Sequence, residues 1–584
     1  MSGGAAGGAP HPSRRRNFSE PVCPYPPVPH SHPRMTNKAI ARQLKLTADL
    51  VELTGGNPFR ARAYASGARA VERLDLPVAT LAADGELSTV QGIGKGLVAE
   101  IEELLATGVM GSTESLLQAL PPGLPEVLRV KGLGVKKVRA LWQEAGVTSI
   151  EDLEAAAAAG RLAELPGFGA KTVENVLAAV EQLKAYRGKA HLRDAATEAL
   201  VARRRLRDAG LRADLAGPVR RQCNVVDRAD LVCAGTPEAV AAALGGGTTH
   251  DDRVEARLPL GLPLTVWTAT DGAYGRVLFQ RTGPDAHVAA VADRAPLADV
   301  TEEDDIYQAA GLSPLPAPLR DDPHWLGVAA SGPLPTLVRT EDLRGTIHNH
   351  TTASDGAHSL REMCDAARER GLGYFGVCDH SRSLQIAHGL SLDEMEAQIR
   401  RVDDLNAAYA DEGVDFRVLA GTEADILTDG TMDYPDELLA RLDLVVASVH
   451  TGFGMTEDEA TARVVAAVAN PYVDVLGHPT GRLLLRREGY PLDHEAVLDA
   501  CAEHGVAVEL NANPWRLDVD WRFVRAATER GVLVSINPDA HATDGLDDVY
   551  WGVASAQKGG LTPDQSLTCK PADELAAWLA ARRP

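Results

Sequence analysis

Two histidines and an aspartate stand close together in the segment GTIHNHTTASDG, residues 345 to 356. His348 and His350 are one residue apart, and Asp355 follows them in a short polar stretch. Side chains at positions i and i+2 of a β-strand point to the same face, so both imidazoles should aim at one spot. Imidazoles and a carboxylate that converge on one spot are typical ligands of a transition-metal ion.

More histidines and carboxylates follow at the ends of apolar segments in the last part of the chain. Ten of the 17 histidines fall between His348 and His541. Short apolar or β-branched runs end in these residues: Asp379 with His380, Glu423, His450, His478, and Asp539 with His541. Helical patterns such as SLREMCDAARERG separate the runs. Alternating strands and helices, with such residues at the carboxyl ends of the strands, predict a parallel β/α barrel with its site on that face.

These segments resemble, almost one for one, the motifs of the PHP (polymerase and histidinol phosphatase) family. The resemblance implies a distorted (β/α)7 barrel in residues 341–584 that holds three divalent metal ions. Imidazole and carboxylate ligands suit Mn²⁺ and Zn²⁺, and Fe²⁺ is a further candidate. The implied ligands are His348, His350, Glu423 and Asp539 for the first ion, Glu423 with His450 and His478 for the second, and Asp355, His380 and His541 for the third.

The chemistry that this cluster would support is the hydrolysis of a phosphoester. Closely spaced metal ions lower the pKa of a bridging water, which can then attack, and they stabilise charge on the phosphate oxygens. Glu423 and Asp539 would hold the ions of this catalytic centre, and Arg482 in HPTGR is a candidate clamp for a phosphate oxygen. The alternative for Arg482 is an ordinary surface salt bridge. Asp379 is expected to orient a neighbouring ligand.

A second kind of motif recurs between residues 35 and 190, where the chain has a helical pattern. The segments VQGIGKGLVAEI, VKGLGVKKVRAL and LPGFGAKTVENV each carry two glycines one residue apart before a helix. They resemble the helix-hairpin-helix motif, whose N–H groups at a helix start bind DNA phosphates without sequence preference. The candidate DNA-binding residues are Gly92, Gly94, Lys95, Gly132, Gly134, Lys136, Lys137, Gly167, Gly169 and Lys171. The alternative, a plain helix junction with solvated lysines, fits one copy better than three.

The order of these regions resembles that of the bacterial family X DNA polymerases, which carry a C-terminal PHP domain. The resemblance covers nearly all of the chain from residue 36 and implies a polymerase-beta-like nucleotidyltransferase domain of mixed α/β type in residues 191–325. Nucleotidyl transfer needs aspartates that clamp two Mg²⁺ ions. In LAGPVRRQCNVVDRADLVCAG, however, Arg228 stands at the first aspartate position and only Asp230 remains. Thr265 stands at the third position, and Gly217-Pro218 replaces the expected Gly-Ser turn.

These departures predict that the middle domain has lost its Mg²⁺ site and its polymerase activity. The fold would be retained as a body that holds DNA. Pairing Asp227 with Asp230 would not restore the site, since residues three apart on a strand face opposite sides. Glu100 stands where related eukaryotic polymerases carry a Schiff-base lysine, so no lyase activity is expected.

Composition limits the remaining possibilities. The 584 residues carry a net charge of −22, which argues against a protein that coats a polyanion with its whole surface. No apolar run approaches the roughly 20 residues of a membrane span, and the seven cysteines are scattered without a C-x-x-C pair. We therefore expect a soluble, cytoplasmic chain without disulfides. Residues 1–34, rich in Gly, Pro and Ser, are expected to be disordered, Met35 is an alternative start to Met1, and residues 326–340 are expected to be a linker.

Three functions remain open from the sequence. The first, which the resemblance implies, is a DNA-binding enzyme of base-excision-type repair that acts as a metal-dependent 3′→5′ exonuclease or phosphodiesterase. The second is a small-molecule phosphatase of the histidinol phosphatase type, with a vestigial N-terminal half. The third is a non-catalytic scaffold that binds DNA and recruits repair partners. The sequence gives no indication of the oligomeric state.

Overall fold

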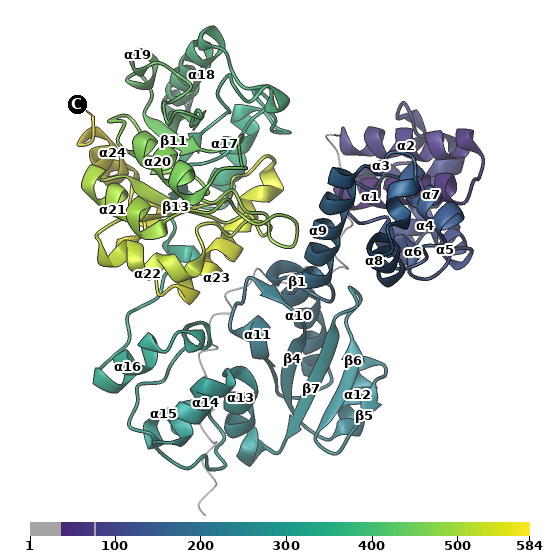
Figure 1. Cartoon of the computed structure of the whole chain (residues 1–584). Coiled ribbons are helices and arrows are strands. Elements are labelled where there is room, and N and C mark those ends of the chain that lie inside the picture. Colours follow the sequence, from purple (N-terminus) through teal and green to yellow (C-terminus); the bar gives the residue numbers. More distant parts are fainter. Residues whose placement is uncertain (1–36, 75–77, 584) are drawn as a thin grey trace, which may run out of the picture.

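The computed structural model describes residues 37–74 and 78–583. The predicted disordered extension, residues 1–34, and both candidate starts, Met1 and Met35, lie outside these residues. Figure 1 shows three regions in chain order: a helical region, a mixed middle region and a barrel. None of the helices in the described ranges combines the length and the apolar character that a membrane span requires. The cysteines in these ranges are all free.

The helical region consists of amphipathic helices that bury their apolar faces against each other. Its helices are α1 (Asn37–Leu53), α2 (Pro58–Glu72), α3 (Val78–Ala83), α4 (Lys95–Thr107), α5 (Gly111–Gln118), α6 (Leu124–Val127), α7 (Val135–Ala145), α8 (Ile150–Ala158) and α9 (Ala170–Tyr186). Leu44 of α1 is buried in the cluster around Ile101, and Leu50 of the same helix in the cluster around Leu141. Helix α1 therefore joins the two halves of this region.

The middle region contains, within the described residues, a five-stranded sheet in the order β2-β4-β7-β6-β5. Its elements are β1 (Ala190–His191), α10 (Leu192–Asp208), β2 (Ala213–Ala216), α11 (Gly217–Arg220), β3 (Val225–Val226), β4 (Ala229–Ala234), α12 (Pro237–Leu244), β5 (Thr248–Thr249), β6 (Arg253–Arg257), β7 (Pro263–Ala269), α13 (Tyr274–Thr282), α14 (Asp285–Ala292), α15 (Asp304–Ala309) and α16 (His324–Ser331). Strands β4 and β7 run parallel and the other neighbours antiparallel. The alanine-rich face of α10 packs on this sheet.

The expected linker, residues 326–340, begins too early. Helix α16 runs through Ser331, and its Trp325 and Ala329 are buried in one cluster with Phe279 and Tyr307. The segment HWLGVAAS, residues 324 to 331, overlaps the first six residues of the expected linker. It is helical because its apolar side chains complete the core of the middle region.

The barrel region contains, within the part of the chain that the structure describes, a seven-stranded sheet in the order β14-β13-β12-β11-β10-β9-β8. Its elements are β8 (Gly345–Thr346), α17 (Leu360–Glu369), β9 (Tyr374–Val377), α18 (Leu392–Asp411), β10 (Arg417–Asp425), α19 (Asp436–Leu439), β11 (Leu444–Ser448), α20 (Glu457–Val468), β12 (Val475–Leu476), α21 (His494–His504), β13 (Ala507–Asn511), α22 (Trp521–Glu529), β14 (Val534–Asn537), α23 (Val549–Lys558) and α24 (Ala572–Ala580).

All neighbouring strands of this sheet are parallel, and a bridge between Asn349 and Ala540 nearly closes it. Helices cover the outside of the barrel (Figure 1), so nearly every strand residue is buried and the strands are apolar runs. The predicted fold class is confirmed: a helical hairpin region, a mixed α/β body and a distorted (β/α)7 barrel.

The three regions meet at Trp515, in the loop after β13. Arg42 of α1 and Arg193 of α10 place their guanidinium groups 5.3 and 5.6 Å from the centre of its indole ring. His191 Nε2 lies 3.0 Å from the carbonyl oxygen of Leu484 in the barrel. These contacts set the hairpins and the middle region against the carboxyl end of the barrel strands.

Candidate metal centre and nucleic-acid interface

The nine predicted ligands gather at the carboxyl end of the barrel strands, around Glu423 of β10. The two carboxylate oxygens of Glu423 face five imidazoles. From Oε2 the distances are 3.4 Å to His348 Nε2, 3.6 Å to His350 Nε2 and 2.9 Å to His380 Nδ1; from Oε1 they are 3.2 Å to His450 Nε2 and 2.8 Å to His478 Nε2. His348 and His350 do share one face, as predicted, although β8 itself ends at Thr346.

Asp539 and Asp355 complete the cluster on the side of His541. Asp539 Oδ1 lies 3.1 Å from His350 Nε2 and 3.7 Å from His541 Nδ1. Asp355 Oδ1 lies 3.3 Å from His541 Nε2 and 3.6 Å from His380 Nε2. Both carboxylates therefore lie beside His541, although they come from opposite ends of the barrel sequence.

Three groups of side chains have donor atoms close enough to share one ion. They are His350, Asp355, His380 and His541; His348, His350 and Asp539; and His380, Glu423 and His450. His350 and His380 each belong to two groups, whereas the ligand sets expected from the resemblance use each of them once. His478 is outside the groups but touches Glu423. The division of the nine residues among three ions stays a prediction.

The donor atoms of this cluster fit divalent cations. Several buried polar atoms there have no hydrogen-bond partner among the described residues: His348 Nε2, His350 Nδ1, His380 Nδ1, His478 Nδ1 and both carboxylate oxygens of Glu423. A buried polar atom without a partner costs free energy. These atoms carry lone pairs and lie together in one cluster, and cations bound there would satisfy them.

Charges within the cluster shift its pKa values strongly. Burial alone would raise the pKa of Glu423, but the imidazoles of His450, His348 and His380 hold it well below its ordinary value. Burial would lower the pKa of His450, yet Glu423 and Asp425 raise it to about 10. The carboxylates thus favour positive charge on an imidazole such as that of His450, and bound divalent cations would supply that charge in place of the protons.

Sequence reasoning missed two buried carboxylates that hold imidazoles of the cluster. Glu509 Oε1 of β13 lies 2.7 Å from His348 Nδ1, and Asp425 Oδ1 of β10 lies 2.5 Å from His450 Nδ1. A carboxylate on the second nitrogen fixes the tautomer and the orientation of a ligand histidine. The signal was a charged residue inside an otherwise apolar strand, as in VAVELNANP.

Arg482, the candidate phosphate clamp, is engaged elsewhere. Its Nε donates to the carbonyl oxygen of Arg516 at 2.9 Å, its Nη2 to that of Leu517, and its Nη1 to Asp520 Oδ2 at 2.5 Å. Arg482 therefore fastens the loop after β13. The guanidinium that faces the cluster is that of Arg516, whose Nε lies 3.6 Å from Asp539 Oδ2.

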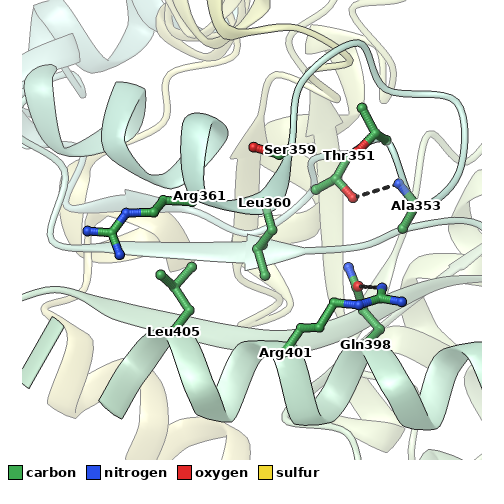
Figure 2. A pocket seen from close by; sticks show the side chains of 9 residues that line it. Thr351, Ala353, Ser359, Leu360, Arg361, Gln398, Arg401 and Leu405 are labelled. Atoms are coloured by element: carbon green, nitrogen blue, oxygen red, sulfur yellow. Dashed lines mark hydrogen bonds between the residues drawn. The ribbon is translucent and has the colours of Figure 1, made fainter. Parts of the chain in front are cut away.

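A cavity of about 470 Å³ lies beside the loop that carries Asp355 (Figure 2). Thr351 and Ala353 of this loop and Gln398 of α18 contribute to its lining. The buried carboxylate of Asp379 accepts hydrogen bonds from the Thr351 N–H and from Gln398 Nε2, both at 2.8 Å. Asp379 thus fastens the loop between His350 and Asp355, in keeping with the expectation that it orients neighbouring groups.

The three predicted hairpins of the helical region have the same backbone geometry. The first glycine of each pair has a positive φ: 101° at Gly92, 88° at Gly132 and 84° at Gly167. The second glycine, Gly94, Gly134 or Gly169, is the N-cap of α4, α7 or α9, and no side chain caps these helices. The N–H groups of the first turn are therefore left for an external acceptor.

No contact within the described part of the chain requires a glycine at the three N-cap positions. Their backbone is extended, and an added Cβ at Gly94, Gly134 or Gly169 would meet no atom of the described residues within 4 Å. A missing side chain there serves the close approach of something outside the protein, such as a phosphate. Of the predicted lysines, Lys171 is 3.0 Å from Glu174, whereas Lys95 and Lys136 are exposed at the helix starts.

The expected nucleotidyltransferase site of the middle region is closed by its own side chains. Arg228 Nε donates to Asp230 Oδ2 at 3.0 Å, and Trp267 Nε1 donates to Oδ1 at 3.3 Å. Thr265 pairs with Asp230 across β4 and β7, at the position expected for the third aspartate. Gly217 has a φ of 58°, and a Cβ there would lie 2.2 Å from Asp230 Oδ2. Asp230 is thus bound to an arginine and a tryptophan, with a threonine beside it.

Comparison with known proteins identifies both kinds of motif. Residues 35–110 match a family described as "Helix-hairpin-helix domain", residues 124–182 a "SAM-like Helix-hairpin-helix tandem" and residues 346–513 the "PHP domain". The chain is 31% identical to "DNA polymerase/3'-5' exonuclease PolX" of Bacillus subtilis (strain 168), over 93% of this chain and 99% of the relative. It is also 28% identical to a "Probable phosphatase" of Thermoanaerobacter sp. (strain X514), over 38% of this chain and 88% of the relative, and 32% identical to one of Acetivibrio thermocellus, over 33% and 78%.

Proposed function

This chain belongs to the PolX family, the bacterial family X DNA polymerases with a C-terminal PHP domain, and from that premise we propose that it is a metal-dependent 3′→5′ exonuclease of DNA repair. The name of the Bacillus subtilis relative contains two activities, DNA polymerase and 3'-5' exonuclease. We assign phosphoester hydrolysis to the barrel, and we propose that polymerase activity is lost in this chain.

The observation that carries the proposal is the convergence of nine ligand-type side chains at one end of the barrel, where six histidines lie against Glu423 or Asp539. Divalent ions held there, Mn²⁺ or Zn²⁺, would activate water and offset charge on the phosphate oxygens. Glu423 would hold ions through both of its carboxylate oxygens, and Glu509 holds the imidazole of His348. Arg516 offers the guanidinium nearest to Asp539.

The loss of polymerase activity is supported by the contacts of Asp230. An arginine that donates to the carboxylate puts a fixed positive charge where Mg²⁺ would have to bind. Thr265 cannot replace the third carboxylate, because a hydroxyl brings no negative charge. In our proposal the middle region holds DNA, and the three hairpins bind its backbone.

A pair of variants tests this assignment on a 3′-recessed duplex in Mn²⁺. The change His350→Ala removes an imidazole that two of the three groups share, so it should lower bound metal and reduce nuclease activity more than about a hundredfold. The matched change Asp230→Asn should leave metal content and nuclease activity as they are. Elemental analysis and release of labelled 3′ nucleotides measure both.

The opposite result would assign catalysis elsewhere: an active His350→Ala protein, or one that cleaves DNA fully in strong chelator, contradicts the barrel site. Incorporation of deoxynucleotides by the wild-type chain would contradict the loss of polymerase activity.

The second candidate function is a small-molecule phosphatase, which the likeness to probable phosphatases favours. It is separated from the first by assaying the whole chain on 3′-recessed DNA and on histidinol phosphate. Hydrolysis of the small ester alone would select the phosphatase. A protein that binds its full complement of metal but hydrolyses neither substrate would favour the third function, the DNA-binding scaffold.

Replacing Glu509 tests the role of a carboxylate that touches no substrate. The change Glu509→Gln keeps the shape but removes the charge that orients His348 Nδ1, so metal affinity should fall by roughly 10–100-fold. Titration of the protein with Mn²⁺ measures the affinity directly. Nuclease activity should return at high Mn²⁺ if Glu509 acts only through metal binding. An unchanged affinity would contradict this role.

A further inference from the structure

A second cavity, of about 440 Å³, lies between the helical region and the middle region. Its walls come from the end of α9, from the segment that follows it and from the turn between β6 and β7. Lining residues include Arg129, Tyr186, Lys189, Asp227 and Arg257. The cavity therefore joins the last hairpin helix to the body of the middle region.

The acidic side chains at this cavity are already paired with arginines. Arg187 holds Glu126 with two hydrogen bonds, of 2.8 and 2.7 Å. Asp227 Oδ1 lies 3.4 Å from Arg228 Nη1. Among the lining residues, four basic side chains (Arg129, Arg187, Lys189 and Arg257) stand against these two acidic ones, so the lining keeps a net positive charge.

Three cations at the cavity have no ion-pair partner among the described residues. Arg129 and Lys189 are exposed and make no side-chain contact with a carboxylate, and Arg257 Nη1 donates only to the carbonyl oxygen of Gly261, at 2.9 Å. The whole chain has a net charge of −22, so the positive lining of this cavity is opposite in sign to the chain as a whole. Such cations repel one another, and an anion bound in the cavity would attract all three and offset that repulsion.

The cavity lies next to the segment that leads into the second hairpin and next to the end of α9. Arg129 precedes Gly132 of the second hairpin by three residues, and Tyr186 is the last residue of α9. The hydroxyl of Tyr186 donates to Glu488 Oε1 of the barrel at 2.8 Å. Glu488 belongs to the loop that also contains Arg482 and Leu484, close to Trp515. The cavity therefore borders both the second hairpin and a helix end that is hydrogen-bonded to the barrel.

We propose that Arg129, Lys189 and Arg257 bind a backbone phosphate of DNA in this cavity, and so hold the strand between the hairpins and the barrel. The proposal rests on the proposed function, in which DNA is the substrate. Guanidinium groups suit a phosphate because they donate paired hydrogen bonds in one plane. The site is separate from the three helix starts, which offer backbone N–H groups.

The test compares the wild type with the full-length triple variant Arg129→Gln, Lys189→Gln and Arg257→Gln. Binding to a 3′-recessed duplex is measured in chelator, which prevents metal-dependent cleavage, at a series of salt concentrations. Loss of one phosphate contact should make the plot of log K against log salt less steep by about 0.9. Affinity at low salt should fall about tenfold, the scale of one lost charge-assisted contact.

A control variant with the same change in net charge carries Arg294→Gln, Arg344→Gln and Arg417→Gln. These arginines are exposed, lie outside the cavity and have no ion-pair partner among the described residues. The control should keep the wild-type salt dependence. Equal losses in both variants, or no loss in the cavity variant, would overturn the proposal.

Thermal stability measured with inorganic phosphate distinguishes DNA from a free phosphate compound as the ligand of the cavity. If millimolar phosphate stabilises the wild type against heat but not the cavity variant, and both proteins bind DNA with the same salt dependence, the cavity takes a free phosphate compound and the DNA assignment is wrong. Because binding is measured without hydrolysis, a failure of the proposed nuclease activity would not be mistaken for a failure of this site.

Discussion

Replacement of Glu423 by glutamine is expected to abolish phosphoester hydrolysis. Glu423 is buried at the centre of the cluster, and its two oxygens face the imidazoles of five histidines. Glutamine keeps the volume but removes the negative charge and one of the two acceptor oxygens. If the ions contribute several kcal/mol to the transition state, hydrolysis should fall at least about a thousandfold.

The experiment measures metal content and nuclease rate in the same preparation. Glu437→Gln is a matched control, because Glu437 is exposed on α19, outside the cluster. The Glu423 variant should remain folded, since the change is nearly isosteric, and it should bind fewer ions. A Glu423→Gln protein that hydrolyses DNA at the wild-type rate would refute the barrel as the catalytic centre.

Replacement of Glu303 by glutamine is expected to destabilise the middle region by about 3–5 kcal/mol, the cost of breaking a buried ion pair from one side. Glu303 is buried between two arginines: Arg220 Nη2 donates to it at 2.7 Å and Arg320 Nη1 at 2.6 Å. Burial would raise the pKa of Glu303, but Arg220 and Arg320 lower it to about 2. The change would leave the guanidinium of Arg320 buried without the carboxylate of Glu303.

Urea unfolding of the full chain, followed by tryptophan fluorescence, measures the free energy of unfolding of each variant. The neighbouring change Glu302→Gln is the control, because Glu302 is exposed and its pair with Arg212 lies at the surface. The stabilisation by Glu303 should be complete above its ordinary pKa near 4.5 and disappear as the pH falls toward 2. Equal midpoints for the Glu302 and Glu303 variants would contradict this prediction.

The cluster of candidate metal ligands could be predicted because histidines, aspartates and glutamates stand at the ends of successive apolar runs. His348, Glu423 and Asp539 each stand in or just after an apolar run, and the carboxyl ends of parallel strands meet at one face of a barrel. Glu509 was missed because it lies inside such a run, where one charged residue looks like an exception. Only the near-closure of the barrel, which brings the segment after β8 to the end of β14, places Glu509 of the neighbouring β13 at His348.

Which of two arginines faces the cluster could not be predicted from the sequence. Arg482 and Arg516 both follow strand ends, so the sequence offers no reason to prefer one. The path of the loop after β13 decides between them, because the carbonyl groups of that loop take the guanidinium of Arg482 and leave Arg516 beside Asp539. Loop paths depend on contacts between distant segments, which a local pattern does not contain.

By itself the sequence indicated the fold class and the hairpin glycines and, through its resemblance to the family's motifs, the family and nine candidate metal ligands, because short motifs of neighbouring residues carry that information. Only the tertiary structure decided which oxygen faces which imidazole, that Asp230 is tied to Arg228 and Trp267, and that three unpaired cations border one cavity. Those facts arise where segments far apart in the chain pack together, and their geometry is set by the whole fold rather than by neighbours in sequence.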